Sequence, residues 1–242
     1  MLSDPLFLSI ALLSVALGAA LQSLTGIGMA VVAAPILILI EPAFLPAPIL
    51  SLGCALCILN TVRNRQSLHA GNIRLALYGR FPGVLAGIPL LALLPQPLLM
   101  IGFALLIIFS VLLSYRRVQL HQTPRNLVIA GFFSGMMGTT TSVGGPAIAL
   151  VYQNSSPQQA RAELGFYFLV GTLMSLSMLG LSGQISAQQV SLTLQMLPAV
   201  LVGFLGSIWL DRYFKANYLK PVIALLSLGS SALILWRAIA QI

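Results

Sequence analysis

Ten apolar stretches follow one another along this chain, with few charges between them. They cover residues 6–24, 28–40, 43–62, 75–94, 98–115, 126–140, 144–153, 160–180, 189–210 and 219–238. Most of them approach the length of about 20 residues that a helix needs to cross a hydrocarbon core. Hydrophobic residues make up 58% of the chain and charged residues 7%, whereas a soluble domain carries about 25% charged residues. The sequence therefore predicts an all-α polytopic membrane protein of about eight to ten helical segments.

Two of these stretches, 28–40 and 144–153, are too short to span, and each follows a break of glycine and hydroxyl residues. The first break reads Thr25-Gly26-Ile27-Gly28, and the second reads Thr141-Ser142-Val143-Gly144-Gly145-Pro146. Apolar segments of about 10–14 residues are typical of re-entrant or half helices. We therefore expect two helical hairpins, 6–40 and 126–153, and the sequence leaves open whether they are re-entrant or fully spanning.

The two breaks stand in one register, with an offset of 116 positions between equivalent residues. In the same register, one Pro-x-Val-Leu-x-Gly motif matches another: Pro82, Val84, Leu85 and Gly87 fall on Pro198, Val200, Leu201 and Gly203. This agreement indicates an internal duplication within one membrane domain. We assign residues 1–116 to the first repeat, 117–125 to a cytoplasmic linker and 126–242 to the second repeat.

The basic residues of equivalent loops are distributed oppositely in the two repeats. Loop 63–74 of the first repeat carries three arginines, whereas the equivalent loop of the second repeat, 179–190, carries no charge. The next pair of loops shows the reverse: 95–97 is uncharged, and the equivalent region 211–220 carries Arg212, Lys215 and Lys220. Because basic loops stay in the cytoplasm, equivalent loops face opposite sides of the membrane. The sequence thus predicts inverted repeats in a bacterial inner membrane, with both termini extracytoplasmic. The formal charge of +8 then comes from basic loops that set the orientation of the protein in the membrane. No nucleic-acid partner is expected.

The breaks are candidates for an anion site. A helix that begins at a break has unpaired N–H groups, and these groups together with the positive end of the helix dipole attract an anion. Two such ends from inverted halves would hold a small oxyanion near the membrane midplane. The alternative is that the glycines serve helix packing alone. The candidate substrate-binding residues are Gln22, Ser23, Thr25, Gly26, Gly28, Thr140, Thr141, Ser142, Gly144 and Gly145.

Two arginines in or beside apolar stretches are candidates for attracting an anion. Ionisable groups within a membrane are functional candidates by default. Arg80 either serves the substrate or extends its charged end to the nearby interface. Arg161 is interpreted first as a cytoplasmic anchor and second as an anion attractor at the inner mouth.

Motifs for bound cofactors and for catalysis are missing from the sequence. There is no nucleotide-binding loop of the G-x-x-x-x-G-K-[ST] type, and His69 and His121 stand alone, so neither a metal nor another cofactor is expected. Cys54 and Cys57 are interpreted as small core residues, with a redox pair as the alternative. We expect no enzyme, although a membrane-embedded enzyme acting on a lipid phosphate stays an alternative, as does an anion channel.

Several motifs, taken in order, resemble the sulfite exporter TauE/SafE family. They are the Gly-Ile-Gly segment within 16–39, Pro82-Gly83-Val84-Leu85-Ala86-Gly87, Gly131-x-x-Ser134-Gly135-x-x-Gly138 followed by Gly144-Gly145-Pro146, and the helix that Arg161-Ala162 opens and Gly183-Gln184-Ile185 follows. The resemblance implies a transporter of small anions, with sulfite, sulfonates and related sulfur compounds as typical substrates. We therefore expect a secondary transporter that works by alternating access. Its expected partners are a small anionic substrate, the lipid bilayer, a coupling ion (proton or sodium) and a second copy of the chain in a homodimer.

Overall fold

The computed structural model describes residues 4–26, 29–68, 70–115, 120–152, 155–211, 228–229, 231–236 and 238–239. Over these residues the regular structure is helical throughout, as the sequence predicted. The helices are α1 (Pro5–Thr25), α2 (Met29–Ile40), α3 (Ala47–Asn64), α4 (Ala70–Leu93), α5 (Gln96–Tyr115), α6 (Pro124–Thr141), α7 (Gly145–Tyr152), α8 (Pro157–Leu181) and α9 (Ala187–Leu210), with short 3-10 turns η1 (Pro42–Phe44) and η2 (Arg65–Ser67). The expected stretch 219–238 and the basic residues Arg212, Lys215 and Lys220 lie wholly or largely outside the described residues.

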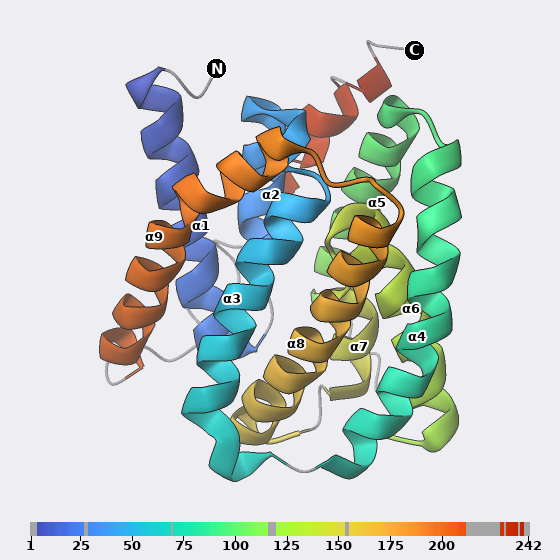
Figure 1. Cartoon of the computed structure of the whole chain (residues 1–242). Coiled ribbons are helices and arrows are strands. Elements are labelled where there is room, and N and C mark those ends of the chain that lie inside the picture. The colour runs from blue at the N-terminus through green and yellow to red at the C-terminus, as the bar shows by residue number, and fades with distance from the viewer. Residues whose placement is uncertain are drawn as a thin grey trace.

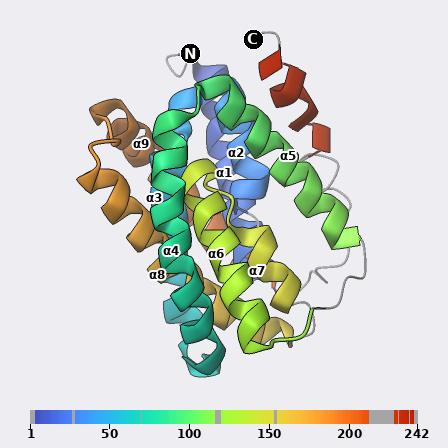
Figure 2. The same cartoon turned by 90° about the vertical axis from the view of Figure 1, so that its right-hand side faces the viewer.

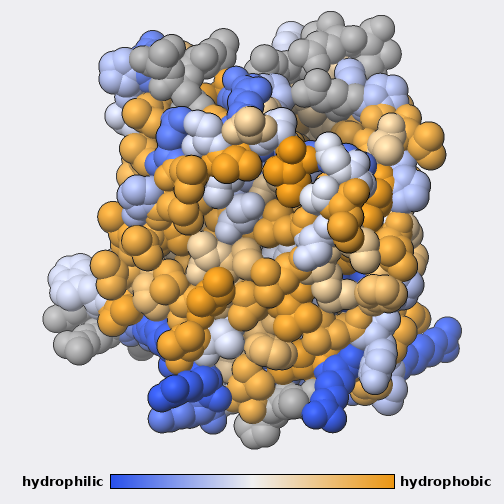
Figure 3. All heavy atoms as spheres, in the orientation of Figure 1, coloured by the Kyte–Doolittle hydropathy of each residue, from blue (hydrophilic) through white to orange (hydrophobic). Residues whose placement is uncertain are grey.

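Within the described chain, five segments are long and apolar enough to cross a membrane. They are Pro5–Thr25, Ala47–Ser67, Gly71–Leu93, Gln158–Leu181 and Ala187–Leu210. Large apolar side chains such as Leu13, Leu93 and Leu205 point outward, and Figure 3 shows apolar residues covering the middle of one face, with the most hydrophilic side chains toward its ends. The polytopic, all-helical membrane protein expected from the sequence is thus confirmed.

The helices form a bundle in which α3 and α8 contact each other along its middle. Helix α9 packs on α1, and α6 packs on α4. The α1–α2 hairpin enters from the upper end of the bundle in Figure 1, and the α6–α7 hairpin enters from the lower end, as Figure 2 also shows. Each short helix, α2 and α7, therefore begins inside the bundle, where its first turn faces other helices.

Local sequence signals set the ends of the broken helices. Helix α1 begins at Asp4, whose carboxylate accepts the N–H of Leu6 at 2.9 Å, and α6 begins at Thr123, whose hydroxyl caps the helix in the same way. Such caps satisfy N–H groups that a helix cannot pair itself. At their other ends both helices stop at a left-handed residue, Gly26 (φ 86°) for α1 and Ser142 (φ 62°) for α6. The chain therefore turns back at the two breaks that the sequence singled out.

Helices α4 and α6 cross at backbone distance because glycines line both of them. A methyl group on Gly79 or Gly83 of α4 would overlap the backbone of α6, and one on Gly131 or Gly135 of α6 would overlap the backbone of α4. Small residues permit such close crossings in membrane proteins. This crossing fixes the backbone of Arg80, the residue beside Gly79, against α6 and the second break.

Candidate anion site

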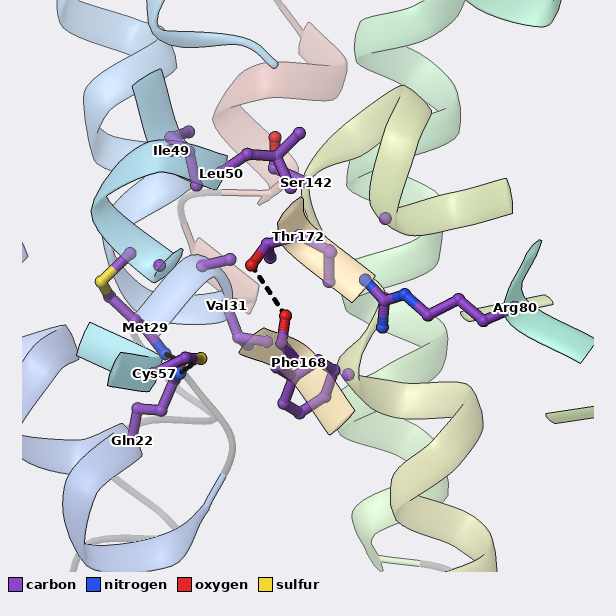
Figure 4. Close-up of a pocket in the computed structure, with 16 residues that line it drawn as sticks. Gln22, Met29, Val31, Ile49, Leu50, Cys57, Arg80, Ser142, Phe168 and Thr172 are labelled. Carbon is purple, nitrogen blue, oxygen red and sulfur yellow. Dashed lines mark hydrogen bonds between the residues drawn. The ribbon is translucent and has the colours of Figure 1, made fainter. Parts of the chain in front are cut away.

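A cavity of about 50 Å³ lies between the two hairpins and the central helices. A single water needs about 10–15 Å³ by this measure, so the space suits an ion of a few atoms. Figure 4 shows the labelled side chains converging from several helices. The lining residues are Gln22, Met29, Ala30, Val31, Ile49, Leu50, Gly53, Cys57, Arg80, Gly138, Ser142, Val143, Gly144, Gly145, Phe168 and Thr172.

Arg80 supplies the charge of this cavity. Its side chain is 1% exposed and extends from α4 toward Thr172 and Phe168 (Figure 4). The guanidinium carbon lies 4.7 Å from the ring centre of Tyr167, and Nη1 donates to the hydroxyl of Ser134 at 3.4 Å. The alternative that Arg80 extends to the interface is wrong, because its charged end is enclosed by α6 and α8.

The environment of Arg80 lacks an acidic partner. Among the described residues, no carboxylate lies within ion-pair distance of Arg80, and its Nε atom is buried with no hydrogen-bond acceptor. Aromatic rings stabilise a cation, yet a buried charge without an opposite charge remains costly. The lining of the cavity is therefore positively charged, and an anion bound there would contact the guanidinium directly.

The second break lies at the cavity wall. Gly145, the first residue of α7, and Gly144 just before it line the cavity, at a helix start where N–H groups have no acceptor within the helix. Ser142 also lines it, and its hydroxyl donates to the carbonyl of Pro46 at 2.9 Å, which ties the break to the start of α3. The positive end of the α7 dipole and the Arg80 guanidinium thus lie on the same cavity.

The first hairpin contributes Gln22, Met29, Ala30 and Val31 to the lining, and of these only Gln22 has a polar side chain. Its Oε1 atom accepts the N–H of Met29 at 3.1 Å, which caps the start of α2, while Nε2 lies 3.5 Å from the sulfur of Cys57. Gly26 contacts the backbone of α8 at Ala160 and Arg161 instead and is not part of the lining. Gly28 lies outside the described residues.

Four of the expected hydroxyl residues do not reach the cavity. The hydroxyls of Thr25, Thr140 and Thr141 donate to carbonyls one turn earlier in their own helices, those of Leu21, Met136 and Met137. Ser23 is buried and, within the described chain, its hydroxyl has no partner. None of the four is among the lining residues. The structure therefore brings together Gln22, Ser142, Gly144, Gly145 and Arg80 from the expected set.

Arg161 lies near the end of the bundle where α8 begins, outside the cavity lining. Its Nη1 atom contacts the carboxylate of Asp211 at 3.0 Å, and Arg63 contacts the same carboxylate at 3.0 Å. This cluster joins α3 and α8 to the end of α9. Because all three side chains are partly exposed, its contribution to stability is modest.

Sequence reasoning missed the contribution of α8 to the cavity. Phe168 and Thr172 line it, and the Thr172 hydroxyl donates to the carbonyl of Phe168 at 2.7 Å (Figure 4). Gly171 between them leaves space for the Arg80 guanidinium, which a methyl group there would overlap. The available signal was the spacing of Phe168, Thr172 and Ser175 along one face of an apolar helix.

Comparisons with known proteins identify the family. The family model described as Sulfite exporter TauE/SafE matches residues 10–234, a range that includes every residue lining the cavity. No curated protein and no solved structure gives a match. The chain belongs to the sulfite exporter TauE/SafE family of membrane transporters.

Proposed function

We propose that this protein moves a small sulfur oxyanion across the membrane and binds it in the central cavity against Arg80. The observation that carries the proposal is a buried guanidinium, 1% exposed, that has no carboxylate partner among the described residues. Holding such a charge inside a membrane protein is costly. An anion in the cavity would offset this cost, and the family supports a sulfur anion as the substrate.

The rest of the cavity supplies neutral donors for such an anion. The N–H groups of Gly144 and Gly145 lie at the start of α7, where the helix dipole favours negative charge. The amide of Gln22 adds a donor from the first hairpin. A volume of about 50 Å³ suits sulfite or an anion of similar size better than a long sulfonate.

Alternating access is supported by the way in which the helices pair. An offset of 116 residues relates α1 to α6, α2 to α7, α3 to α8 and α4 to α9. When each helix is replaced by its equivalent in the other half, one observed contact maps onto another. The contact of α1 with α9 corresponds to that of α6 with α4, and the contact of α3 with α9 corresponds to that of α8 with α4. The left-handed residues Gly26 and Ser142 also stand in this register. Such inverted halves can exchange conformations around a central site.

The alternative of an enzyme acting on a lipid phosphate finds no support at the cavity. Such chemistry requires a general acid or base, and the residues that line the described cavity include no aspartate, glutamate or histidine. A channel differs from a carrier in that its flux does not require a conformational cycle. Counterflow, in which a substrate gradient drives exchange, separates the two.

Flux into proteoliposomes tests the proposal, with sulfite, thiosulfate, sulfate and methanesulfonate as the substrates offered. We expect saturable sulfite flux and counterflow in the unaltered protein. Arg80→Gln should lower the flux by about 30-fold or more, because removing one partner of a buried charge pair costs at least about 2 kcal/mol. Arg74→Gln removes an exposed charge from the same helix and should leave the flux unchanged. Flux retained in Arg80→Gln would refute the assignment.

A further inference from the structure

Glu163 on α8 stands apart from the other acidic residues of the described chain. It is 0% exposed, whereas Asp4 caps α1, Glu41 caps η1 and Asp211 binds two arginines. One oxygen of Glu163, Oε1, accepts a hydrogen bond from Gln159 at 2.8 Å. The other oxygen, Oε2, is buried and meets no donor among the described residues. A buried carboxylate with a free oxygen in a membrane helix is a candidate for carrying a proton.

Two tyrosines connect Glu163 to the anion cavity. The side chain of Tyr152 on α7 interacts electrostatically with both Glu163 and Tyr167, and both tyrosine hydroxyls are buried without a described partner. Tyr167 lies one turn after Glu163 on the same helix face. Its ring also lies under the guanidinium of Arg80 at 4.7 Å. Tyr167 thus contacts the guanidinium with its ring and lies one helical turn from the carboxylate in sequence.

Other charged side chains near α8 do not balance Glu163. On α8 itself, Arg161 is paired with Asp211. Elements that pack against α8 carry further described arginines. Arg63 is paired with Asp211. Arg65, Arg74 and Arg125 are exposed. Arg80 is the buried cation that shares this interior with Glu163.

We propose that Glu163 carries a proton that crosses the membrane together with the anion, an inference that rests on the proposed function of the Arg80 cavity. With the cavity empty, an ionised Glu163 balances the charge of Arg80. With a monovalent anion such as bisulfite bound, the interior is neutral when Glu163 is protonated. Net charge buried in a membrane is costly, so the neutral forms of the protein are the ones that change conformation readily. The empty and the anion-loaded forms are both neutral only when one proton travels with each monovalent anion.

The step needs no other reactant. A proton from the aqueous side binds Oε2 of Glu163 to form an O–H bond, and the same bond breaks when the proton leaves on the opposite side. The Tyr152 hydroxyl interacts electrostatically with Glu163 and has no other hydrogen-bond partner among the described residues. After a rotation of its O–H it is able to donate to the carboxylate, and it is able to accept from the carboxylic acid. One phenol can therefore serve both forms of Glu163.

Proteoliposomes with a pH-sensitive dye inside and a sulfite gradient across the membrane test this inference. We expect the unaltered protein to move protons with sulfite, above the background of protein-free liposomes. In Glu163→Gln the loaded form stays neutral, but the empty form holds Arg80 unbalanced. We therefore expect sulfite counterflow to persist within about threefold, while proton movement and net sulfite flux fall by about tenfold or more.

Asp4→Asn is the matched control, because asparagine caps a helix as well as aspartate does and its position is exposed. This variant should couple sulfite to protons like the unaltered protein. Three results would overturn the inference and leave the proposed function standing. In folded Glu163→Gln, they are sulfite flux that still carries protons, or a loss of sulfite counterflow. In the unaltered protein, the third is sulfite flux that follows a sodium gradient without proton movement. Absence of sulfite flux in the folded, unaltered protein would instead refute the proposed function.

Discussion

The guanidinium of Arg80 depends on residues that lie far from it in the sequence. Gly171 of α8 leaves the space that the guanidinium fills, and Gly138 of α6 lies against its Nη2 side. The rings of Tyr167 and Phe168 cover it at 4.7 and 5.7 Å. The position of the charge is therefore a property of three packed helices, and a change in any one of them should move it.

Gly171→Ala tests this dependence without altering a residue that contacts the anion. The added methyl group would displace the guanidinium, and a misplacement of about 1 Å can cost about 100-fold in function. We expect sulfite flux to fall by about tenfold or more. Gly165→Ala on the same helix is the control, because its methyl group would make ordinary contacts, the nearest at 3.7 Å. Equal flux in the two variants would argue against a positioning role for Gly171.

The sequence identified Arg80 as a candidate but could not determine where its charge lies. An arginine about one and a half turns from the expected end of its helix is compatible both with a substrate role and with a charged end that extends to the interface. The space beside Gly171 becomes visible only when α4 and α8 pack. The threonines of the second break show the same limit. Thr141 is a potential anion donor by residue type, yet its hydroxyl donates to Met137 in its own helix at 2.7 Å. Such local bonds are common for threonine in helices.

The broken hairpins are the elements that sequence predicts best. The stretches 28–40 and 144–153 correspond to α2 (Met29–Ile40) and α7 (Gly145–Tyr152), because the breaks are local signals of glycine and a following apolar run. The crossing of α4 and α6 is not local. Its glycines are visible in the sequence, but only the structure shows which helix each of them contacts.

Gly83→Ala measures what the α4–α6 crossing contributes to stability. The methyl group would meet the backbone of Phe132, and overpacking of this kind costs about 1–3 kcal/mol. We expect a lower midpoint of thermal unfolding in detergent. In the control Gly206→Ala, no atom lies within 4 Å of the added methyl group. This change should be neutral or stabilising by up to about 1 kcal/mol, the helix preference of alanine over glycine. A Gly83→Ala protein as stable as the control would contradict the close crossing.

At the scale of the whole molecule, the proposed inverted repeat makes equivalent loops face opposite sides of the membrane. Gln66 and Ser182 stand 116 positions apart, and both are exposed at loops between helices. The loop charges predict Gln66 in the cytoplasm and Ser182 outside. The pairing of helices supports the repeat, because the contacts of α9 with α1 and with α3 have counterparts in the contacts of α4 with α6 and with α8.

Cysteine labelling at these two positions tests the topology. The native cysteines, Cys54 and Cys57, are buried, so a membrane-impermeant thiol reagent should report mainly on Gln66→Cys and Ser182→Cys. In intact cells we expect Ser182→Cys to react and Gln66→Cys to react only after the membrane is opened. Labelling of both positions from the same side would rule out inverted repeats.

An experimental structure with bound selenite would show whether the anion lies between Arg80 and the first turn of α7. Selenite has the shape and charge of sulfite, and its selenium atom can be located by anomalous scattering. We expect a selenium peak within the cavity, with selenite oxygens in hydrogen-bond distance of the Arg80 guanidinium and of the N–H groups of Gly144 or Gly145. A saturated protein whose selenium peak lies elsewhere, with the Arg80 cavity empty, would contradict this expectation.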